Sequence, residues 1–453
     1  MNGFWTLDSI SDALGEMLRE ARPRGAKQLT AITTDSRSIK PGELFVALKG
    51  ENFDGHSFVA DVVRAGAAAV LVSDAARATG IGVPAFVVDD TLIALGRLGT
   101  YWRRVWGKTV IGVAGSNGKT STKELLRAAL SQTFEVHATT GNLNNRIGVP
   151  LTLLAIPPET DVAVIELGTS LPGEVAILRD IAMPDIAIVT SVAEEHLEGL
   201  GDLRGVLQEE VSVFDGVSVG IVPNAQPEIG EAAKGRAKRL ASAGLDAGDL
   251  KATRWEISPE GLGKVVVGDV EFSPPIRGAH NLRNMMLALA AATECGVDLA
   301  AAARGISNMP QPKMRVAWEK IGNAILINDA YNANPGSTRA AIELITSSGD
   351  ARQRVIVLGT MRELGPKSEE CHDDMAVLAL QSGAQVVAGI GDFSQALERV
   401  GKGDARIVTA EDVDDLWPKL ATRLAPDAII LLKASRGVQL ERLVPHITAW
   451  AGH

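Results

Sequence analysis

The stretch KTVIGVAGSNGKTS, residues 108–121, contains the strongest local signal in the chain. The apolar run of Lys108–Ala114 predicts a buried strand, Gly115–Gly118 a tight loop, and Thr120–Ser131 an amphipathic helix. Such a glycine loop turns backbone N–H groups toward phosphate oxygens, and the start of the helix adds a partial positive charge. The stretch therefore predicts a nucleoside triphosphate site between a strand and a helix.

Two side chains strengthen this interpretation of the loop. Lys119 would reach the outer phosphates, and Thr120 would ligate Mg²⁺. The loop departs from the general phosphate-loop pattern, because Val113 stands five residues before Gly118, where that pattern has glycine. The alternative, a glycine-rich turn with a capping threonine, is disfavoured by the Gly-Lys-Thr run.

Strand-like and helix-like segments alternate over almost the whole chain, which favours an α/β fold over a bundle or a sandwich. Short β-branched runs that enter polar or glycine-containing loops suit the central strands of a mostly parallel sheet. We expect such strands at residues 162–167, 186–190, 324–328, 355–358, 386–390 and 429–433. The segment Met309–Lys313, MPQPK, predicts a linker, and a first block ends near Trp106. The expected domains are therefore 1–106, 107–311 and 312–453.

Composition limits the classes of protein to which the chain can belong. With 453 residues, 46% of them hydrophobic, it is long enough for about three domains with buried cores, which excludes disorder of the whole chain. The 45 Lys and Arg against 55 Asp and Glu give a net charge of −10, which argues against a nucleic-acid coat or an anionic membrane surface. An anionic ligand must then be held by local groups.

Cysteine use and the apolar pattern predict a reduced, cytoplasmic protein. Cys295 and Cys371 are far apart in sequence, so we expect neither a disulfide framework nor a zinc cluster. The longest apolar runs fall short of the roughly 20 residues that span a bilayer. The first residues carry acids and no basic segment, which differs from a signal peptide.

Further segments, taken with the phosphate loop, resemble the Mur ligase family of ATP-dependent amide-bond ligases of peptidoglycan synthesis. The resemblance covers essentially the whole chain. Its segments are TDSR (34–37), PGELFVALKG (41–50), DGHSF (54–58), TTGNLNNRIGVPL (139–151), IELGTSLPGEV (165–175), HLEG (196–199), GAHNLRNMMLALA (278–290), DAYNANPGS (329–337) and ELG (363–365). The form of DAYNANPGS is similar to that of the family branch that adds D-alanyl-D-alanine.

The resemblance implies three α/β domains: a smaller N-terminal one that binds a UDP-muramoyl peptide, a central phosphate-loop domain with a mostly parallel sheet, and a C-terminal Rossmann-like domain. The C-terminal domain would bind D-alanyl-D-alanine and close over ATP. The implied reaction is ATP-dependent ligation of D-alanyl-D-alanine to UDP-N-acetylmuramoyl-tripeptide through an acyl phosphate. Small-molecule substrates, no nucleic-acid or membrane partner and a monomeric state are also implied. Two alternatives stay open: a Mur-type amide ligase with a different amine substrate, and a non-catalytic nucleotide-binding subunit.

The resemblance also assigns the residues that would bind ATP and its metal. Mg²⁺, with Mn²⁺ as the alternative, would be ligated by Thr120, Glu166 and His196, although imidazole is an unusual Mg²⁺ ligand. Lys119, Glu166 and His196 would act in catalysis. ATP would be bound by Gly115, Ser116, Asn117, Gly118, Lys119, Thr120, Ser121, Asn281, Asn284, Arg315 and Asp329.

One catalytic position departs from the family pattern. The family carries a lysine shortly beyond the matching histidine, and its carbamylated side chain supplies a carboxylate near the metal and the γ-phosphate. Here Glu210 stands at that position, and no lysine occurs from Glu124 to Ala233. We predict that Glu210 supplies the carboxylate directly; a solvated surface glutamate beside Glu209 is the alternative.

Residues for the other two substrates follow from the same resemblance. The nucleotide-sugar and the muramoyl peptide would contact Ser36, Arg37, Gly50, Asp54, Gly55, His56, Thr140, Asn142, Asn145, Thr169 and Ser170. The dipeptide and a closing basic tract would involve Asn332, Asn334, Ser337, Lys433, Ser435 and Arg436. For the nucleotide-sugar and muramoyl-peptide residues, the alternative is turn capping, because Asx and Ser residues in loops often cap turns.

Overall fold

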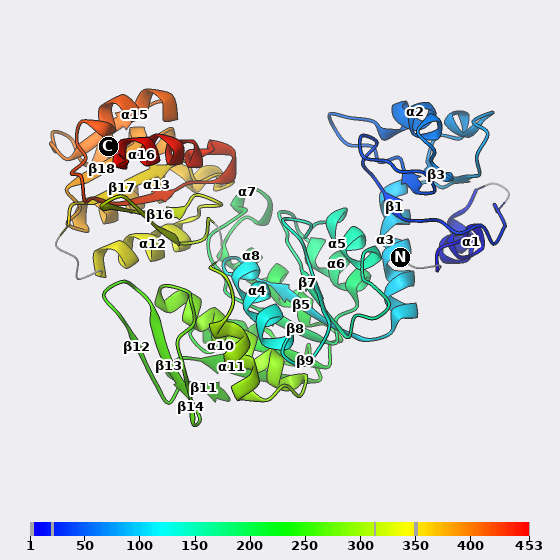
Figure 1. Cartoon of the computed structure of the whole chain (residues 1–453), viewed down its shortest axis with the longest axis horizontal. Coiled ribbons are helices and arrows are strands. Elements are labelled where there is room, and N and C mark those ends of the chain that lie inside the picture. The colour runs from blue at the N-terminus through cyan, green and yellow to red at the C-terminus, as the bar shows by residue number, and fades with distance from the viewer. Residues whose placement is uncertain (1–3, 20–21, 312–313, 348–351, 453) are drawn as a thin grey trace. The chain divides into compact units, whose positions relative to one another are not determined.

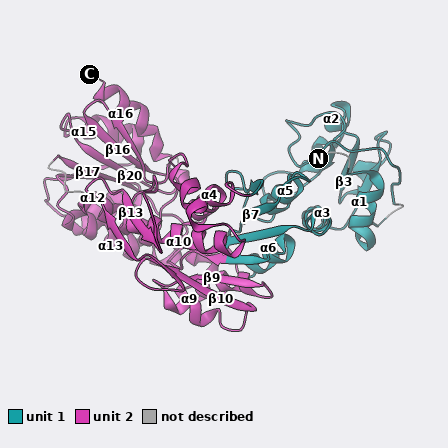
Figure 2. Cartoon of the chain, turned by 60° about the horizontal axis from the view of Figure 1, so that its bottom comes forward, with its two compact units in different colours: residues 1–113, 134–169, 173–187 teal, residues 114–133, 170–172, 188–453 magenta. Residues whose placement is uncertain are grey.

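The computed structural model describes residues 4–19, 22–311, 314–347 and 352–452. The chain divides into two compact units (Figure 2). Unit 1 comprises residues 1–113, 134–169 and 173–187, and unit 2 comprises residues 114–133, 170–172 and 188–453. Helices alternate with mostly parallel strands in both, which confirms the α/β prediction (Figure 1).

The N-terminal part of unit 1 is built on a four-stranded parallel sheet in the order β1-β2-β3-β4. Its strands are β1 Ile32–Thr33, β2 Leu44–Val46, β3 Ala69–Val72 and β4 Ala85–Val87. Its helices are α1 Leu7–Leu14, α2 Val59–Arg64 and α3 Thr91–Trp106. Every residue of β2 and β3 is buried, as the apolar strands of a parallel sheet require.

Helix α3 ends the first sequence block and is anchored by its aromatic residues. The indole N–H of Trp102 donates to the carbonyl of Ile156 at 3.2 Å, and that of Trp106 donates to the carbonyl of Thr160 at 3.2 Å. These bonds tie α3 to the segment that follows the phosphate loop, so unit 1 continues past Trp106. The division into 1–106, 107–311 and 312–453 stays a prediction.

The largest sheet has seven strands in the order β11-β10-β9-β8-β5-β7-β6. Its strands are β5 Thr109–Ala114, β6 Val136–Ala138, β7 Val162–Glu166, β8 Ile186–Val189, β9 Val219–Pro223, β10 Arg239–Gly244 and β11 Leu250–Lys251. The helices of this region are α4 Lys119–Leu130, α5 Gly148–Leu154, α6 Glu174–Ala182, α7 Leu197–Leu200, α8 Leu203–Val211, α9 Pro227–Ala232, α10 Ala279–Glu294 and α11 Leu299–Ser307. Strands β5, β7 and β8 fall within a residue of the predicted ones.

A three-stranded antiparallel sheet lies between β11 and α10 in sequence (Figure 1). Its strands are β12 Arg254–Ile257, β13 Gly263–Val267 and β14 Val270–Phe272. Buried and partly exposed residues alternate along β13, as in a sheet covered on one face. No strand of this sheet was predicted from the sequence.

The C-terminal part of unit 2 has six strands in the order β15-β16-β20-β17-β18-β19, and only the β15–β16 pair is antiparallel among the described pairings. Its strands are β15 Ala317–Ile321, β16 Ala324–Asp329, β17 Arg354–Gly359, β18 Val386–Ile390, β19 Ile407–Ala410 and β20 Ile429–Lys433. Its helices are α12 Pro335–Ser347, α13 Ser368–Gln381, α14 Asp392–Val400, α15 Val413–Ala421 and α16 Leu443–Ala451. Asp329 pairs in register with Lys433, so the segments after β16 and β20 leave the sheet side by side.

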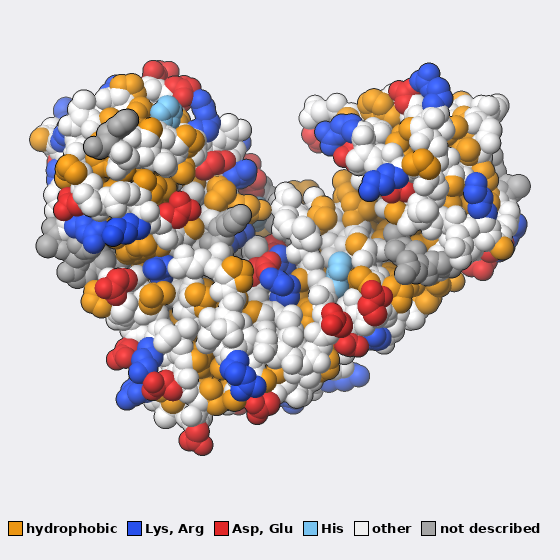
Figure 3. Space-filling view, viewed as in Figure 1, with side chains coloured by type: hydrophobic (Ala, Val, Ile, Leu, Met, Phe, Trp, Pro, Cys, Tyr) orange, Lys and Arg blue, Asp and Glu red, His pale blue; other side chains and the backbone are white. Residues whose placement is uncertain are grey.

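Three remaining features are the predicted linker, the apolar length of the helices and the surface charges. The predicted linker Met309–Lys313 includes residues 312 and 313, which lie outside the described residues. No helix in the described part of the chain is long and apolar enough to cross a membrane. On the face drawn in Figure 3, acidic and basic side chains are interspersed.

Candidate functional site

The predicted phosphate loop forms the turn between β5 and α4. Gly115 has φ +118° and Gly118 has φ +91°, a backbone region that favours glycine. A Cβ on Gly115 would collide with Thr190 Oγ1, and one on Gly118 would lie 2.6 Å from the amide of Asn284. Close packing against the end of β8 and against α10 therefore demands glycine at both positions.

Lys119 begins α4 and turns back into this loop. Its Nζ donates to the carbonyl oxygens of Gly115 and Ser116, the second at 3.1 Å. It also lies 3.7 Å from Oε1 of Glu195, a residue that the sequence analysis did not single out. The ammonium group is thus held within the loop, as a phosphate-binding lysine requires.

Hydrogen bonds from backbone N–H groups join the loop to the segment after β8. The N–H of Ser116 donates to the carbonyl of Ser191 at 2.8 Å, and the N–H of Ala193 donates to Ser116 Oγ at 2.9 Å. The N–H of Asn117 donates to Ser191 Oγ at 3.0 Å. Ser121, in the first turn of α4, is buried. The loop is therefore held in place by several hydrogen bonds to this segment.

Glu210 lies on α8 and contacts the loop directly. The side chain is only 1% exposed, and its Oε2 accepts the N–H of Gly115 at 2.6 Å. Its Oε1 has no hydrogen-bond partner among the described residues. Burial, reinforced by Glu195 and Glu209, outweighs Lys119 and the Gly115 N–H and raises the pKa of Glu210 from 4.5 to about 7. The alternative of a solvated helix-face glutamate is wrong.

His196 precedes α7 in a left-handed conformation, with φ +51°. Its Nδ1 is hydrogen-bonded to the carboxylate of Glu363, and its Nε2 lies 4.0 Å from Oε2 of Glu195. Burial alone would lower the pKa of His196, but the hydrogen bond to Glu363 and the two carboxylate charges raise it. The Glu363 contact orients the ring and leaves Nε2 as the atom available to a metal.

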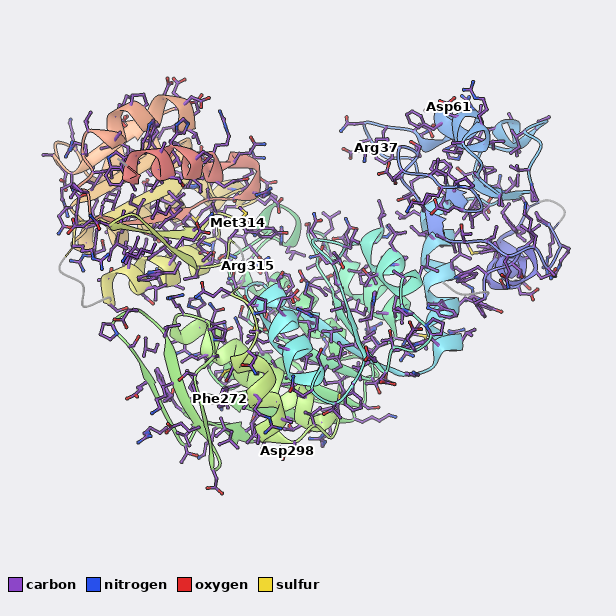
Figure 4. The ribbon with its side chains drawn as sticks, in the orientation of Figure 1. Arg37, Asp61, Phe272, Asp298, Met314 and Arg315 are labelled. Atoms are coloured by element: carbon purple, nitrogen blue, oxygen red, sulfur yellow. The ribbon has the colours of Figure 1, made fainter. Side chains whose placement is uncertain are left out.

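Arg315 approaches the loop from the segment before β15 (Figure 4). Its guanidinium donates to Thr120 Oγ1 at 2.8 Å and lies 4.3 Å from the ring centroid of Tyr331. Asp329 accepts from the N–H of Val316 at 3.1 Å and pairs with Lys433 Nζ at 2.8 Å. Asp329 and Lys433 thus form an ion pair beside Val316, and the neighbouring Arg315 contacts the phosphate loop.

The segment 329–337 reaches the phosphate loop through Asn334. Asn334 Nδ2 donates to Asn117 Oδ1 at 2.9 Å, and Asn117 Nδ2 donates back to Asn334 Oδ1 at 3.1 Å. The same Nδ2 donates to Glu195 Oε2 at 3.3 Å. Ser337 closes the turn by exchanging hydrogen bonds with Asn334. Two segments more than 200 residues apart in sequence therefore meet at one buried polar cluster.

The residues present fit a metal that arrives with nucleotide. No group of three or more His, Cys, Asp or Glu side chains in the described ranges could hold a metal ion by itself. In nucleotide sites Mg²⁺ is bound by one or two protein groups together with phosphates. The buried Glu195 Oε1, without a hydrogen-bond partner among the described residues, is the hard oxygen that such a cation prefers.

Comparison with known families decides the relationship of the chain. Three family models match it: "Mur ligase family, catalytic domain" at residues 28–102, "Mur ligase middle domain" at 113–292 and "Mur ligase, glutamate ligase domain" at 314–436. The UDP-N-acetylmuramoyl-tripeptide–D-alanyl-D-alanine ligases of Bacillus subtilis and Escherichia coli are each 36% identical to it. These matches cover 91% and 97% of this chain and 92% and 97% of the relatives. The chain belongs to the Mur ligase family.

Solved structures of Mur ligases agree with this assignment. A MurF structure from Acinetobacter baumannii is 30% identical, with a TM-score of 0.89 over 98% of this chain and 99% of that one. MurF from Thermotoga maritima in complex with ADP shares the fold, with a TM-score of 0.82 at 24% identity over 94% and 98% of the two chains. The resemblance and the three-domain Mur ligase architecture predicted from the sequence are confirmed.

In unit 1 of this Mur ligase, Glu166 ends β7 and is buried. Its Oε1 accepts from Asn144 Nδ2 at 2.9 Å, and its N–H donates to Thr139 Oγ1 at 2.9 Å. Asn145 accepts from the N–H groups of Ile147 and Gly148, so it caps a turn. The other predicted residues of unit 1 differ in exposure: Thr140 and Asn142 are exposed, and Thr169 is buried. Ser170, which belongs to unit 2, is exposed.

The N-terminal residues proposed for the nucleotide-sugar divide into exposed and buried ones. Arg37 is exposed and pairs with Asp35 at 2.8 Å, beside the partly buried Ser36 (Figure 4). His56 is buried; its Nδ1 lies 2.6 Å from Asp54, and its Nε2 accepts the N–H of Ser73 at 2.9 Å. Both ring nitrogens of His56 therefore have partners within the protein. Gly50 and Gly55 lie in the turn around this pair, and a Cβ at Gly55 would meet the backbone of residue 48.

The residues predicted for adenine and for the closing tract have internal partners. Asn281 Nδ2 donates to the carbonyl of Arg277 at 2.9 Å, and Asn284 faces Gly118. The carbonyl of Asn332 accepts from Lys433 Nζ at 2.6 Å. Ser435 Oγ accepts the N–H of Arg362 at 3.0 Å, and the exposed Arg436 pairs with Glu441 at 2.7 Å.

Sequence reasoning missed Glu195 and Glu363, which pair with Lys119 and His196. Glu194 and Glu195 are adjacent in sequence and belong to no spaced motif. Only the structure shows which of them is buried in the site. Glu194 pairs with Lys367 at 3.0 Å, and its side chain is 33% exposed, whereas the side chain of Glu195 is 6% exposed. Glu363 lies in the ELG segment of the family resemblance, which was the available signal.

Proposed function

We propose that this Mur ligase joins D-alanyl-D-alanine to UDP-N-acetylmuramoyl-tripeptide with cleavage of ATP to ADP and phosphate. The observation that carries the proposal is the contact between Asn117 of the phosphate loop and Asn334 of the segment 329–337. It brings the loop that would hold ATP beside the segment that resembles the D-alanyl-D-alanine branch of the family. The printed names of the B. subtilis and E. coli relatives support the same substrates.

The proposed reaction has two steps. The carboxylate of the tripeptide attacks the γ-phosphorus, the bond to the β–γ bridging oxygen breaks, and an acyl phosphate and ADP form. The amino group of the dipeptide then attacks the acyl carbon, loses a proton, and expels phosphate as the amide forms. The protein must position the reactants, neutralise charge and exclude water.

The loop and α4 supply most of the charge neutralisation. Lys119 would turn from its loop carbonyls to the outer phosphates, and Gly115–Ser121 would offer backbone N–H groups at the start of α4. Arg315, now on Thr120 Oγ1, would add a second positive charge. Thr120, Glu166 and His196 would hold Mg²⁺ or Mn²⁺, which when bound neutralises phosphate charge.

Glu210 would supply the carboxylate that a modified lysine supplies elsewhere in the family. Its buried position on the Gly115 N–H and its unpartnered Oε1 support this role. Activity should then be independent of bicarbonate and should fall in Glu210→Ala. Stimulation of the wild type by bicarbonate, or full activity of the alanine variant, would contradict the assignment.

The remaining predicted residues are proposed for substrate contacts. The UDP-sugar and muramoyl peptide would contact residues of the N-terminal and middle regions: Ser36, Arg37, Gly50, Asp54, Gly55, His56, Thr140, Asn142, Asn145, Thr169 and Ser170. Adenosine would contact Asn281, Asn284 and Asp329, and the dipeptide and product side would contact Asn332, Asn334, Ser337, Lys433, Ser435 and Arg436. A cytoplasmic location and a monomeric state stay predictions.

Phosphate release tests this function. Purified protein with ATP, Mg²⁺ and the UDP-muramoyl-tripeptide should release phosphate only when D-alanyl-D-alanine is added. Equal phosphate release with and without the dipeptide would contradict the proposed amine substrate. No phosphate release under any condition would favour the non-catalytic subunit.

A further inference from the structure

Glu195 is a buried carboxylate beside Lys119 and His196, and beyond offering an oxygen to a cation it has no task in the proposed reaction. Its side chain is 6% exposed, and its Oε1 has no hydrogen-bond partner in the described part of the chain. That oxygen faces Lys119 Nζ at 3.7 Å. The other oxygen accepts from Asn334 Nδ2 at 3.3 Å and lies 4.0 Å from His196 Nε2.

The surroundings make Glu195 the counter-charge of Lys119. Its negative charge also acts on Glu210, whose carboxyl lies close enough for its pKa to respond. A buried carboxylate is stable only when a cation or hydrogen-bond donors compensate it. Asn334 satisfies one oxygen, so the Lys119 ammonium carries the compensation of the other.

Nucleotide binding would change the charge compensation between Glu195 and Lys119. The phosphates attract Lys119, because they carry more negative charge than the loop carbonyls and the Glu195 carboxylate that it contacts. Once Lys119 turns to phosphate, Glu195 remains buried beside new negative charge. A divalent cation that arrives with the nucleotide restores the balance, whereas metal-free nucleotide does not.

We propose that Glu195 is a positioning residue that acts through Lys119 and makes nucleotide binding depend on a divalent cation. The inference rests on the proposed nucleotide site and adds to it a discrimination against metal-free nucleotide. Glu194 provides the matched control, because it is adjacent, carries the same charge and pairs with Lys367 at 3.0 Å instead of with Lys119.

Calorimetric titration with ADP, in Mg²⁺ and in EDTA, tests the proposal on the full chain. The measured quantity is the dissociation constant in EDTA divided by that in Mg²⁺, determined for the wild type, Glu195→Gln and Glu194→Gln. Removal of a buried charge this close to the phosphates should lower the ratio by at least about tenfold in Glu195→Gln, through tighter metal-free binding. Glu194→Gln should keep the wild-type ratio.

Two further variants separate charge from packing. Glu195→Asp keeps the charge and should keep most of the metal dependence, and Glu195→Ser provides a second neutral side chain should glutamine disturb folding. An unchanged ratio in both neutral variants, or an equal loss in Glu195→Asp, would overturn the proposal. Failure of the wild type to bind ADP with Mg²⁺ would instead overturn the proposed nucleotide site.

Discussion

Replacing Glu210 with glutamine should make the nucleotide-free protein more stable at neutral and alkaline pH. Folding raises the pKa of the Glu210 carboxyl from 4.5 to about 7, chiefly by burial. The folded chain therefore binds the proton more tightly than the unfolded chain, and stability falls as pH rises between these values. Glutamine keeps an acceptor for the Gly115 N–H and cannot ionise.

The pKa shift sets the size of the effect. A rise of the pKa from 4.5 to about 7 lowers the free energy of unfolding of the wild type by about 3 kcal/mol above pH 7. Below pH 4.5 the carboxyl is protonated in both states, and this loss disappears. Urea unfolding followed by circular dichroism, at several pH values from 5 to 8, would measure it. The free energy of unfolding of Glu210→Gln should exceed that of the wild type by up to about 3 kcal/mol at pH 8, and the difference should become much smaller at pH 5.

Glu256→Gln is the matched control, because Glu256 on β12 is exposed and its carboxylate is not buried by folding. That variant should follow the wild type at every pH. A Glu210→Gln variant that is less stable than the wild type at pH 8, or a difference that does not depend on pH, would refute the burial argument.

Three further experiments with four substitutions test the loop and its contacts. Lys119→Ala should lower kcat/KM for ATP by at least about 100-fold in a phosphate-release assay, since it removes the charge nearest the outer phosphates; an effect under fivefold would contradict that role. Gly115→Ala should lose ADP binding by calorimetry and destabilise the chain by roughly 2–4 kcal/mol, because its Cβ would collide with Thr190 at φ +118°; wild-type stability would argue against the close packing. Asn117→Ala and Asn334→Ala should be non-additive in a double-mutant cycle of unfolding free energy, with a coupling of about 1 kcal/mol; additive losses would show that the paired amides contribute nothing as a pair.

Local sequence signals predicted the parallel sheets well. The apolar run before the phosphate loop and the β-branched runs at 162–167 and 429–433 are buried on both faces, so few alternatives suit them. The antiparallel strands β12 and β14 escaped prediction because each is short and half polar. Their pairing, which depends on contacts distant in sequence, decides their structure.

Site residues that stand in known motifs could be predicted from the sequence. Residues that enter the site only through tertiary packing could not. Lys119 and His196 stand in recognisable motifs, and the structure brings both to Glu195. Nothing in the pair Glu194 and Glu195 tells which acid turns inward. Their partners come from distant parts of the chain: Lys367 pairs with Glu194, and Lys119 and Asn334 contact Glu195. The burial of Glu210 likewise comes from tertiary packing of α8 against the loop.

The identity of the amine substrate is the central claim, and a competition measures it most directly. Purified protein would receive ATP, Mg²⁺ and UDP-muramoyl-tripeptide, with either diaminopimelate or lysine as its third residue, and an equimolar mixture of D-alanyl-D-alanine and single amino acids. Mass spectrometry of the products should show one species, heavier by the dipeptide. A product that carries one added amino acid, or no product while the chain binds ADP, would contradict the account.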